Sequence, residues 1–275
     1  MEKGSGPRAT VLLADGREAP ALGLGTHELE GRACEHAVAE ALDLGYRHID
    51  TAEGYGNERS IGAAIRGADR AGIFLTSKVS PDHLRPADVV RACEGSLCRL
   101  GTDYLDLYLV HWPNREVPLA ETVEALISLR ASGLIRSWGV SNFTATHLRE
   151  AARVELPATN QVEIHPHFRQ EGLADACREL GLPLTAYSPL ARGRVLDDPV
   201  IGEVAGARGC SVTQVVLAWL LRRGHLVIPK ASSRRHLEDN RGALAIELTG
   251  AEVDLMEGRP QGERLFDFDW AEFDR

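Results

Sequence analysis

The run YLDLYLVHW, residues 104–112, is apolar over most of its length and ends in His111 and Trp112. Segments with helical patterns lie on both sides of it. Residues 86–100 begin with Pro86, a residue common at the first position of a helix, and residues 117–132 end just before Gly133, a common stop. A short apolar run between two helices is typical of a buried strand in a parallel sheet, so this unit predicts an α/β fold.

Seven further apolar runs repeat this arrangement along the chain. They span residues 21–26, 46–52, 72–79, 135–142, 158–164, 182–189 and 225–231. Eight strands that alternate with helices favour a (β/α)8 TIM barrel over an open doubly wound sheet. The glycine fingerprint of such open sheets is also missing, because the GLGT run at 23–26 is followed by Glu28 where the third glycine belongs.

We therefore predict a single barrel domain over residues 1–275. An N-terminal β-hairpin is expected within residues 1–20, with its turn at Asp15-Gly16, because this residue pair is a strong hairpin signal. Residues 257–275 form a short C-terminal tail that is rich in charged and aromatic side chains. This tail either packs on the barrel beyond the last repeat or closes over a site.

Composition limits the classes of function. A net charge of −9 disfavours binding to nucleic acid or to anionic membranes. The sequence contains no apolar run of eighteen residues and no apolar segment near its start, so neither membrane spanning nor secretion is expected. The five cysteines, at 34, 93, 98, 177 and 210, form no C-x-x-C pair, which fits a reducing compartment. We expect a cytoplasmic protein.

Polar side chains gather where the predicted strands end, which in a TIM barrel is the face that carries function. Only three of the 31 basic residues are lysines, and two of these, Lys78 and Lys230, end apolar runs. The other polar and aromatic side chains at these ends are Asp50, Thr51, Tyr55, His111, Trp112, Ser141, Asn142, Gln161, Tyr187 and Ser188.

An aspartate, a tyrosine, a lysine and a histidine together can deliver a proton to a carbonyl oxygen. A free tyrosine has a pKa of about 10, and the ammonium of Lys78 is expected to lower the pKa of Tyr55. Asp50 would keep Lys78 protonated, and His111 would orient the carbonyl. Each residue also has a structural interpretation: an ion pair for Asp50 and Lys78, a core histidine for His111, and a surface turn for Tyr55.

Protonation of a carbonyl oxygen is productive only when something attacks the carbon, and this set contains no activated nucleophile. A hydride donor is therefore expected. The second half of the chain offers groups for a carboxamide (Ser141, Asn142, Gln161), an aromatic face (Tyr187) and a phosphate-binding turn (Lys230, Ser232, Ser233).

Two other functions remain open at this point. Lys78 could form a Schiff base, as barrel-strand lysines of aldolases do, although pairing with Asp50 would keep it charged. The barrel could also bind a dinucleotide as a sensor or regulatory subunit with little turnover. A metal site is not expected, because His165 and His167 have no third ligand nearby in the sequence.

Eight short motifs strongly resemble those of the aldo-keto reductase family, in the family's order and over nearly the whole chain. They are GLGT (23–26), DTAEGYGNE (50–58), LTSK (75–78), LVHWP (109–113), GVSNF (139–143), NQVE (160–163), AYSPLARG (186–193) and IPK (228–230). The nearest similarity is to the short bacterial branch of 2,5-diketo-gluconate and methylglyoxal reductases, because the tail is brief.

The resemblance implies a TIM-barrel, NAD(P)H-dependent reductase of aldehydes and ketones that acts by direct hydride transfer, without a metal and as a monomer. It makes Tyr55 the general acid, Lys78 and Asp50 its tuning pair, and His111 the residue that orients the substrate. The cofactor-binding residues that it implies are Thr26, Asp50, Ser141, Asn142, Gln161, Tyr187, Ser188, Pro189, Leu190, Lys230, Ser232, His236, Asp239 and Asn240.

The sequence departs from the family pattern at the expected phosphate site. Members with a strong preference for NADPH usually carry serine and arginine where this chain has Ala231 and His236. Neutral histidine lacks the charged fork of arginine, although Arg234 or Arg235 could substitute for it. We therefore expect a modest preference for NADP(H), with NAD(H) usable.

The substrate pocket also differs from that of many relatives. His27 stands where an aromatic residue is common, and Gly54 stands where a larger apolar residue is common, just before Tyr55. With His111 and with Trp112 as an apolar wall, these residues predict a roomier and more polar pocket. Such a pocket suits small dicarbonyls or oxidised sugars better than steroids.

Overall fold

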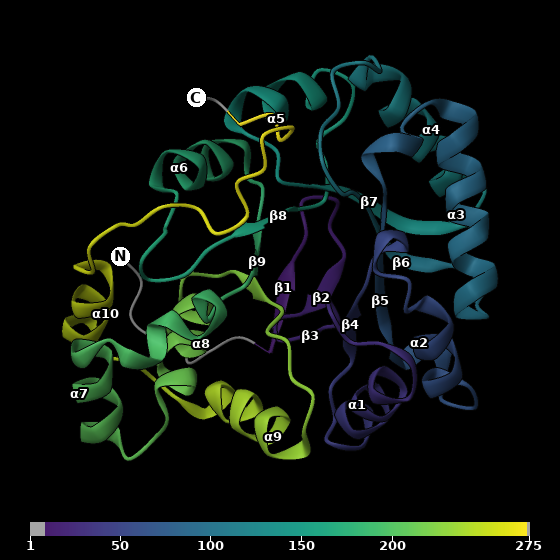
Figure 1. The fold of residues 1–275 in the computed structure, drawn as a ribbon. Coiled ribbons are helices and arrows are strands. Elements are labelled where there is room, and N and C mark those ends of the chain that lie inside the picture. Colours follow the sequence, from purple (N-terminus) through teal and green to yellow (C-terminus); the bar gives the residue numbers. More distant parts are fainter. Residues whose placement is uncertain (1–8, 274–275) are drawn as a thin grey trace.

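The computed structural model describes residues 9–273 of the chain (Figure 1). Eight parallel strands form one sheet in which each strand pairs with the next along the sequence. They are β3 (Leu24–Gly25), β4 (His48–Asp50), β5 (Phe74–Val79), β6 (Leu105–Val110), β7 (Ile135–Ser141), β8 (Asn160–Glu163), β9 (Leu184–Tyr187) and β10 (Leu226–Val227).

The first and last strands meet and close the sheet into a barrel. Isolated parallel bridges join Leu22 to Val227 and Gly25 to Lys230. The Val227 amide donates to the Ala21 carbonyl at 2.7 Å, and the Gly25 amide donates to the Pro229 carbonyl at 3.1 Å. The predicted (β/α)8 TIM-barrel fold is thereby confirmed.

Helices surround the sheet (Figure 1). The α-helices are α1 (Gly31–Asp43), α2 (Glu58–Ile65), α3 (Pro86–Leu100), α4 (Leu119–Ala131), α5 (Ala145–Ala151), α6 (Glu171–Leu180), α7 (Pro199–Arg208), α8 (Val212–Arg222), α9 (Arg234–Gly242) and α10 (Gly250–Glu257). Short 3₁₀ helices are η1 (Glu53–Tyr55), η2 (Arg70–Gly72), η3 (Pro81–His83), η4 (Ala191–Asp197) and η5 (Ala243–Ala245). The helix predicted at 86–100 has these bounds in the structure.

The predicted strands all exist, but most are shorter than expected. The last strand, predicted at 225–231, covers only Leu226–Val227. Pro229 lacks the amide hydrogen that a longer ladder would need, so the backbone there can only accept a hydrogen bond. The helix predicted at 117–132 begins at Leu119 because Pro118 occupies its N-cap.

The N-terminal hairpin covers one end of the barrel. Strands β1 (Thr10–Leu12) and β2 (Glu18–Pro20) pair antiparallel, and Gly16 supplies the positive φ of 86° in their turn. Asp15 accepts a 2.5 Å hydrogen bond from the Ser137 hydroxyl of β7, which ties the turn to the barrel. The first eight residues of the predicted 1–20 hairpin, like residues 274–275, lie outside the described part. The single domain over 1–275 therefore stays a prediction.

The C-terminal tail follows α10 and runs back past α6 towards α5 (Figure 1). Among the described residues, no single helix is long and apolar enough to cross a membrane. Helices α7 and α8 together reach that length and composition, but they are bent by 93° relative to each other.

Candidate active site

A cavity of about 830 Å³ opens at the carboxyl ends of the barrel strands. Its walls come from almost every strand end and from the tail. The lining residues are Gly25, Thr26, His27, Glu28, Asp50, Gly54, Tyr55, His111, Trp112, Ser141, Asn142, Gln161, Tyr187, Ser188, Pro189, Leu190, Arg192, Gly193, Ile228, Pro229, Lys230, Leu265, Phe266 and Phe268.

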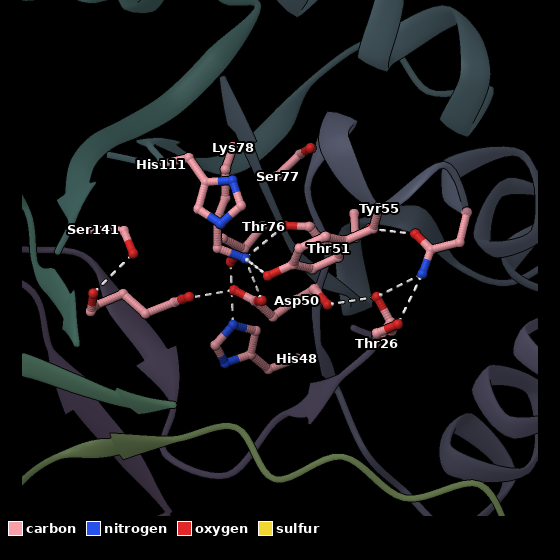
Figure 2. Close-up of polar contacts among 12 residues, drawn as sticks. Thr26, His48, Asp50, Thr51, Tyr55, Thr76, Ser77, Lys78, His111 and Ser141 are labelled. Carbon is pink, nitrogen blue, oxygen red and sulfur yellow. Dashed lines mark hydrogen bonds and ion pairs between the residues drawn. The ribbon is translucent and has the colours of Figure 1, made fainter. Parts of the chain in front are cut away.

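Asp50, Lys78 and Tyr55 form a hydrogen-bonded chain at the bottom of this cavity (Figure 2). Lys78 at the end of β5 is fully buried, and its Nζ donates to Asp50 Oδ1 at 2.5 Å. The same Nζ lies 2.8 Å from the Thr51 carbonyl oxygen and 3.5 Å from Tyr55 Oη. The predicted tyrosine, lysine and aspartate are therefore brought together.

The loop after β4 is built to hold Tyr55. Asn57 donates to the carbonyls of Thr26 at 2.8 Å and Leu29 at 3.0 Å and accepts from the Thr51 hydroxyl at 2.7 Å, so it ties two strand ends together. The left-handed Gly56, with φ 69°, ends η1 directly after Tyr55.

Burial raises the pKa of Tyr55 above the usual value for tyrosine, and the Asp50 carboxylate adds to the increase. The expected lowering of this pKa is wrong for this structure, in which the pKa is raised. The Lys78 ammonium lies 2.5 Å from Asp50 and 3.5 Å from the phenol oxygen. Burial also lowers the pKa of Lys78, against the opposing effect of Asp50. Tyr55 thus keeps its proton at neutral pH and can donate it.

Two imidazoles flank the Tyr55 ring. The His111 ring centroid lies 5.6 Å from that of Tyr55, and the His27 centroid lies 4.9 Å from it, both edge to face. Burial, followed by the nearby charge of Lys78, holds the pKa of His111 well below its usual value. The pKa of His27 is lowered too, chiefly by burial. Both rings are therefore neutral at pH 7, and each has one donor and one acceptor nitrogen.

The predicted amide-binding residues form a network on the opposite wall. Gln161 Nε2 donates to the second oxygen of Asp50 at 2.7 Å, which links the cofactor side to the proton-delivery chain. The Ser141 hydroxyl donates to the Gln161 carbonyl at 2.8 Å, and the Tyr187 hydroxyl donates to Asn142 Oδ1 at 2.8 Å. Asn142 has φ 61°, a strained value for a residue with a side chain.

A three-residue ion bridge crosses the cavity mouth and was not expected from the sequence. Glu28 lies 3.0 Å from Lys230 Nζ and 3.1 Å from an Arg192 guanidinium nitrogen. Glu28 and Arg192 both have positive φ, 61° and 53°. Glu28 directly follows the GLGTH run, and Arg192 lies within the AYSPLARG motif. The opposite charges of Glu28 and Arg192, each beside or within a site motif, were the only sign of this bridge in the sequence.

Four predicted cofactor residues do not line the cavity. Ser232 and His236 are exposed beside Lys230, Asn240 is buried in α9, and Asp239 accepts a hydrogen bond from the Ser211 hydroxyl at 3.0 Å. Their contact with a cofactor stays a prediction. Of the two suggested substitutes, Arg234 is already paired with Asp43 at 2.8 Å, Glu238 at 3.2 Å and Glu40 at 3.8 Å. Arg235 is exposed and does not line the cavity.

The tail supplies one wall of the cavity. Phe266 packs edge to face on Tyr187, with ring centroids 5.4 Å apart, and lies 6.4 Å from His27. Trp112 is buried beneath Phe268 and Trp270, which stack with nearly parallel rings. The tail therefore does both things considered for it: it packs on the barrel, and it closes one side of the site.

Comparison with known proteins agrees with this geometry. A sequence model of the Aldo/keto reductase family matches residues 21–258. The chain belongs to the aldo/keto reductase family. It is therefore an NAD(P)H-dependent oxidoreductase of that family, as the motifs predicted.

Individual relatives resemble nearly the whole chain. An aldo-keto reductase from Mycolicibacterium vanbaalenii is 39% identical over 261 residues, covering 93% of this chain and 94% of the relative. The structure of a protein provisionally named 2,5-diketo-D-gluconic acid reductase B is 37% identical with a TM-score of 0.92, covering 97% of each chain. A Bombyx mori aldo-keto reductase solved in complex with NADP is 33% identical with a TM-score of 0.88, covering 94% of each chain.

The structure disfavours the Schiff-base interpretation of Lys78. This side chain is fully buried and does not line the cavity, so a substrate carbon has no open path to its nitrogen. Among residues 9–273, no group of three or more histidine, cysteine, aspartate or glutamate side chains is arranged to hold a metal.

Proposed function

We propose that this aldo-keto reductase reduces small dicarbonyls or oxidised sugars to alcohols, with Tyr55 as the general acid. The observation that carries the proposal is the chain Asp50–Lys78–Tyr55 at the bottom of the cavity, with links of 2.5 and 3.5 Å, beside the neutral His111. A tyrosine that stays protonated can donate to an oxygen only as strong negative charge develops there, as in an alkoxide. Carbonyl reduction by hydride develops such an alkoxide, so it suits a tyrosine of this kind.

The chain's residues suit a nicotinamide dinucleotide. Gln161 Nε2 is committed to Asp50, whereas no hydrogen bond within the described part of the chain engages its Oε1, which is free to accept from a carboxamide. Ser141 and Asn142 lie beside it, and Tyr187 presents a ring to stack on. Ser188, Pro189 and Leu190 would line the pyrophosphate, and Lys230 would contact the phosphate of the adenosine ribose. When bound in reduced form, the cofactor supplies the hydride.

The substrate class follows from the pocket around Tyr55. His27 faces Tyr55 on one side and His111 does so on another, and no hydrogen bond within residues 9–273 engages the His27 ring. A neutral imidazole there can donate to a second oxygen next to the reacting carbonyl. A Cβ on Gly54 would meet no atom within 4 Å, so the pocket has open room at this position. Dicarbonyls and oxidised sugars carry such a neighbouring oxygen.

We further propose a modest preference for NADPH with NADH usable. Lys230 is partly neutralised by Glu28, and Arg234 by Asp43, Glu238 and Glu40. His236 adds no fixed charge at neutral pH. We also propose that the enzyme is cytoplasmic, because its free cysteines at 34, 93, 98, 177 and 210 suit a reducing compartment. We propose further that it is a monomer.

Isotope transfer tests the proposed reaction. Methylglyoxal is incubated with the enzyme and with NADPH that carries deuterium at C4 of the nicotinamide, and the alcohol product is examined by mass spectrometry and NMR. Direct hydride transfer places deuterium on the carbon that was the carbonyl. Cofactor oxidation with all deuterium lost to water would refute direct transfer. Tight cofactor binding without turnover of a wide carbonyl panel would favour the sensor function instead.

A further inference from the structure

Glu163, the last residue of β8, is a fully buried carboxylate that is held mainly by the tail. The Leu265 amide donates to both of its oxygens, at 3.0 and 3.1 Å, and the Phe266 amide donates to Oε2 at 3.2 Å. His165 Nε2 lies 3.1 Å from Oε1. Within residues 9–273, no lysine or arginine comes within ion-pair distance of this carboxylate.

The two tail residues whose amides donate to Glu163 also line the cavity. Leu265 and Phe266 both line it, and the Phe266 ring lies against Tyr187 at 5.4 Å. The Arg192 guanidinium lies over the Phe266 ring, 5.7 Å from its centroid. One carboxylate at the end of a rigid strand therefore fixes the backbone of a cavity wall.

Among the contacts of the tail described here, those of Glu163 hold the backbone next to the cavity. Upstream, the Gly262 amide donates to the His167 carbonyl at 2.7 Å, and downstream Glu272 pairs with Arg115 at 2.8 Å. Between them, the Arg264 side chain donates to Gln170 Oε1 at 3.1 Å, and the Phe268 ring packs on Trp112. Glu163 differs from these contacts because it binds the backbone amides of Leu265 and Phe266. A buried carboxylate without donors is strongly unfavourable, so the tail amides and Glu163 stabilise one another.

The tail lies outside the part of the chain that matches the family model, which ends at residue 258. We propose that Glu163 is a positioning residue: by docking Leu265 and Phe266 it sets one wall of the carbonyl pocket and thereby the affinity for substrate. The inference rests on the proposed carbonyl reduction. It assigns to Glu163 no contact with the reacting atoms, because Glu163 does not line the cavity.

The Glu163→Gln variant tests this role. The glutamine amide is nearly the same size, but it presents a donor where two backbone amides need acceptors. We expect KM for methylglyoxal to rise about tenfold, with kcat within about twofold and the Kd for NADPH unchanged. Glu171→Gln is the matched control, since Glu171 is half exposed, pairs with Arg169 and Arg223 and does not line the cavity. Its kinetics should equal those of the wild type.

Trypsin reports docking of the tail without reference to activity. The Arg264–Leu265 peptide bond contains the first of the two docked amides, so undocking exposes it. The Glu163→Gln variant should be cut after Arg264 several-fold faster than the wild type and than Glu171→Gln. If Glu163→Gln does not fold, Leu265→Pro takes its place, because proline removes the amide hydrogen that both carboxylate oxygens accept and leaves the barrel strand untouched. This variant is read by its KM for methylglyoxal, because trypsin does not cleave an Arg–Pro bond.

A double-mutant cycle separates positioning from a general structural role. If Glu163 acts through Phe266, Phe266→Ala and Glu163→Gln raise KM non-additively, and the double variant resembles Phe266→Ala alone. Unchanged KM and unchanged cleavage in Glu163→Gln, or additive effects in the cycle, would overturn the proposal. Failure of the wild type on every carbonyl would instead refute the proposed function, and the cleavage assay would still decide whether Glu163 docks the tail.

Discussion

At the level of single residues, the Tyr55 ring contacts the rings of His27 and His111, and its hydroxyl lies 3.5 Å from Lys78 Nζ. Asp50, Tyr55, Lys78 and His111 stand at strand ends in motifs that suggest proton delivery, and the structure brings them together around one cavity. The pKa of Tyr55 moves opposite to expectation because burial, which no local motif reveals, and the Asp50 carboxylate both raise it. The Glu28 bridge was missed for a similar reason, since its partners are 164 and 202 residues away.

His27 provides a test of substrate choice at this scale. His27→Phe keeps an aromatic ring beside Tyr55 but removes the proposed donor to the second oxygen. We expect kcat/KM for methylglyoxal to fall about 2- to 13-fold, which corresponds to one hydrogen bond of about 0.5–1.5 kcal/mol. Propanal, which has the same number of carbons and a single carbonyl, should be reduced within about twofold of the wild-type rate. Equal losses for both substrates would argue against the role given to His27.

Glu28 provides a test of cofactor choice. The variant Glu28→Gln frees Lys230 from its partner at 3.0 Å and leaves the ammonium available to a phosphate. Exposed pairs of this kind contribute about 0.2–1 kcal/mol, so the ratio of kcat/KM with NADPH to that with NADH should rise by up to about fivefold. Glu30→Gln, which changes an exposed residue off the cavity, is the control. A ratio that stays constant or falls in Glu28→Gln would show that Lys230 is not restrained by this bridge.

At the level of elements, periodicity predicted the existence and order of the eight strands, and the structure confirms them. Their lengths could not be predicted, because a barrel strand ends where its neighbour stops pairing, and that depends on residues far away in sequence. The last strand shows this: its pairing partners include Ala21 at the start of the barrel. Closure of the barrel is a long-range property.

Gly25 tests the importance of closure. A Cβ at Gly25 would lie 2.6 Å from the Ile228 carbonyl oxygen across the closing seam, so the two strands must move apart. We expect Gly25→Ala to lower the free energy of unfolding by about 1–3 kcal/mol, measured by urea denaturation. Gly54→Ala is the matched control, because its Cβ meets nothing within 4 Å. Similar stabilities for the two variants would mean that the seam is more tolerant than its geometry indicates.

At the level of the whole molecule, a barrel that buries neutral histidines should lose stability in acid. Burial lowers the pKa of His225 to about 3, whereas the unfolded chain titrates near the ordinary value of about 6.5. The folded state therefore resists protonation. The stability contributed by neutral His225 is complete above about pH 6.5 and is lost as the pH falls towards 3, by about 1.4 kcal/mol per pH unit.

Urea denaturation between pH 7 and pH 4 measures this loss. His225→Phe should reduce the slope of unfolding free energy against pH by about one proton, and His36→Gln, at an exposed helix position, should leave the slope unchanged. A slope in His225→Phe equal to that of the wild type would show that His225 is protonated in the folded state.

Turnover of methylglyoxal by the wild type and by Tyr55→Phe, followed through NADPH absorbance, shows whether Tyr55 is the proton donor in carbonyl reduction. Tyr104→Phe, whose ring stacks with Arg70 and Arg136 away from the cavity, is the control. General acid catalysis contributes about 10²- to 10⁴-fold, so kcat should fall by that factor in Tyr55→Phe alone, with NADPH affinity retained. A Tyr55→Phe enzyme that keeps wild-type kcat would show that another group donates the proton.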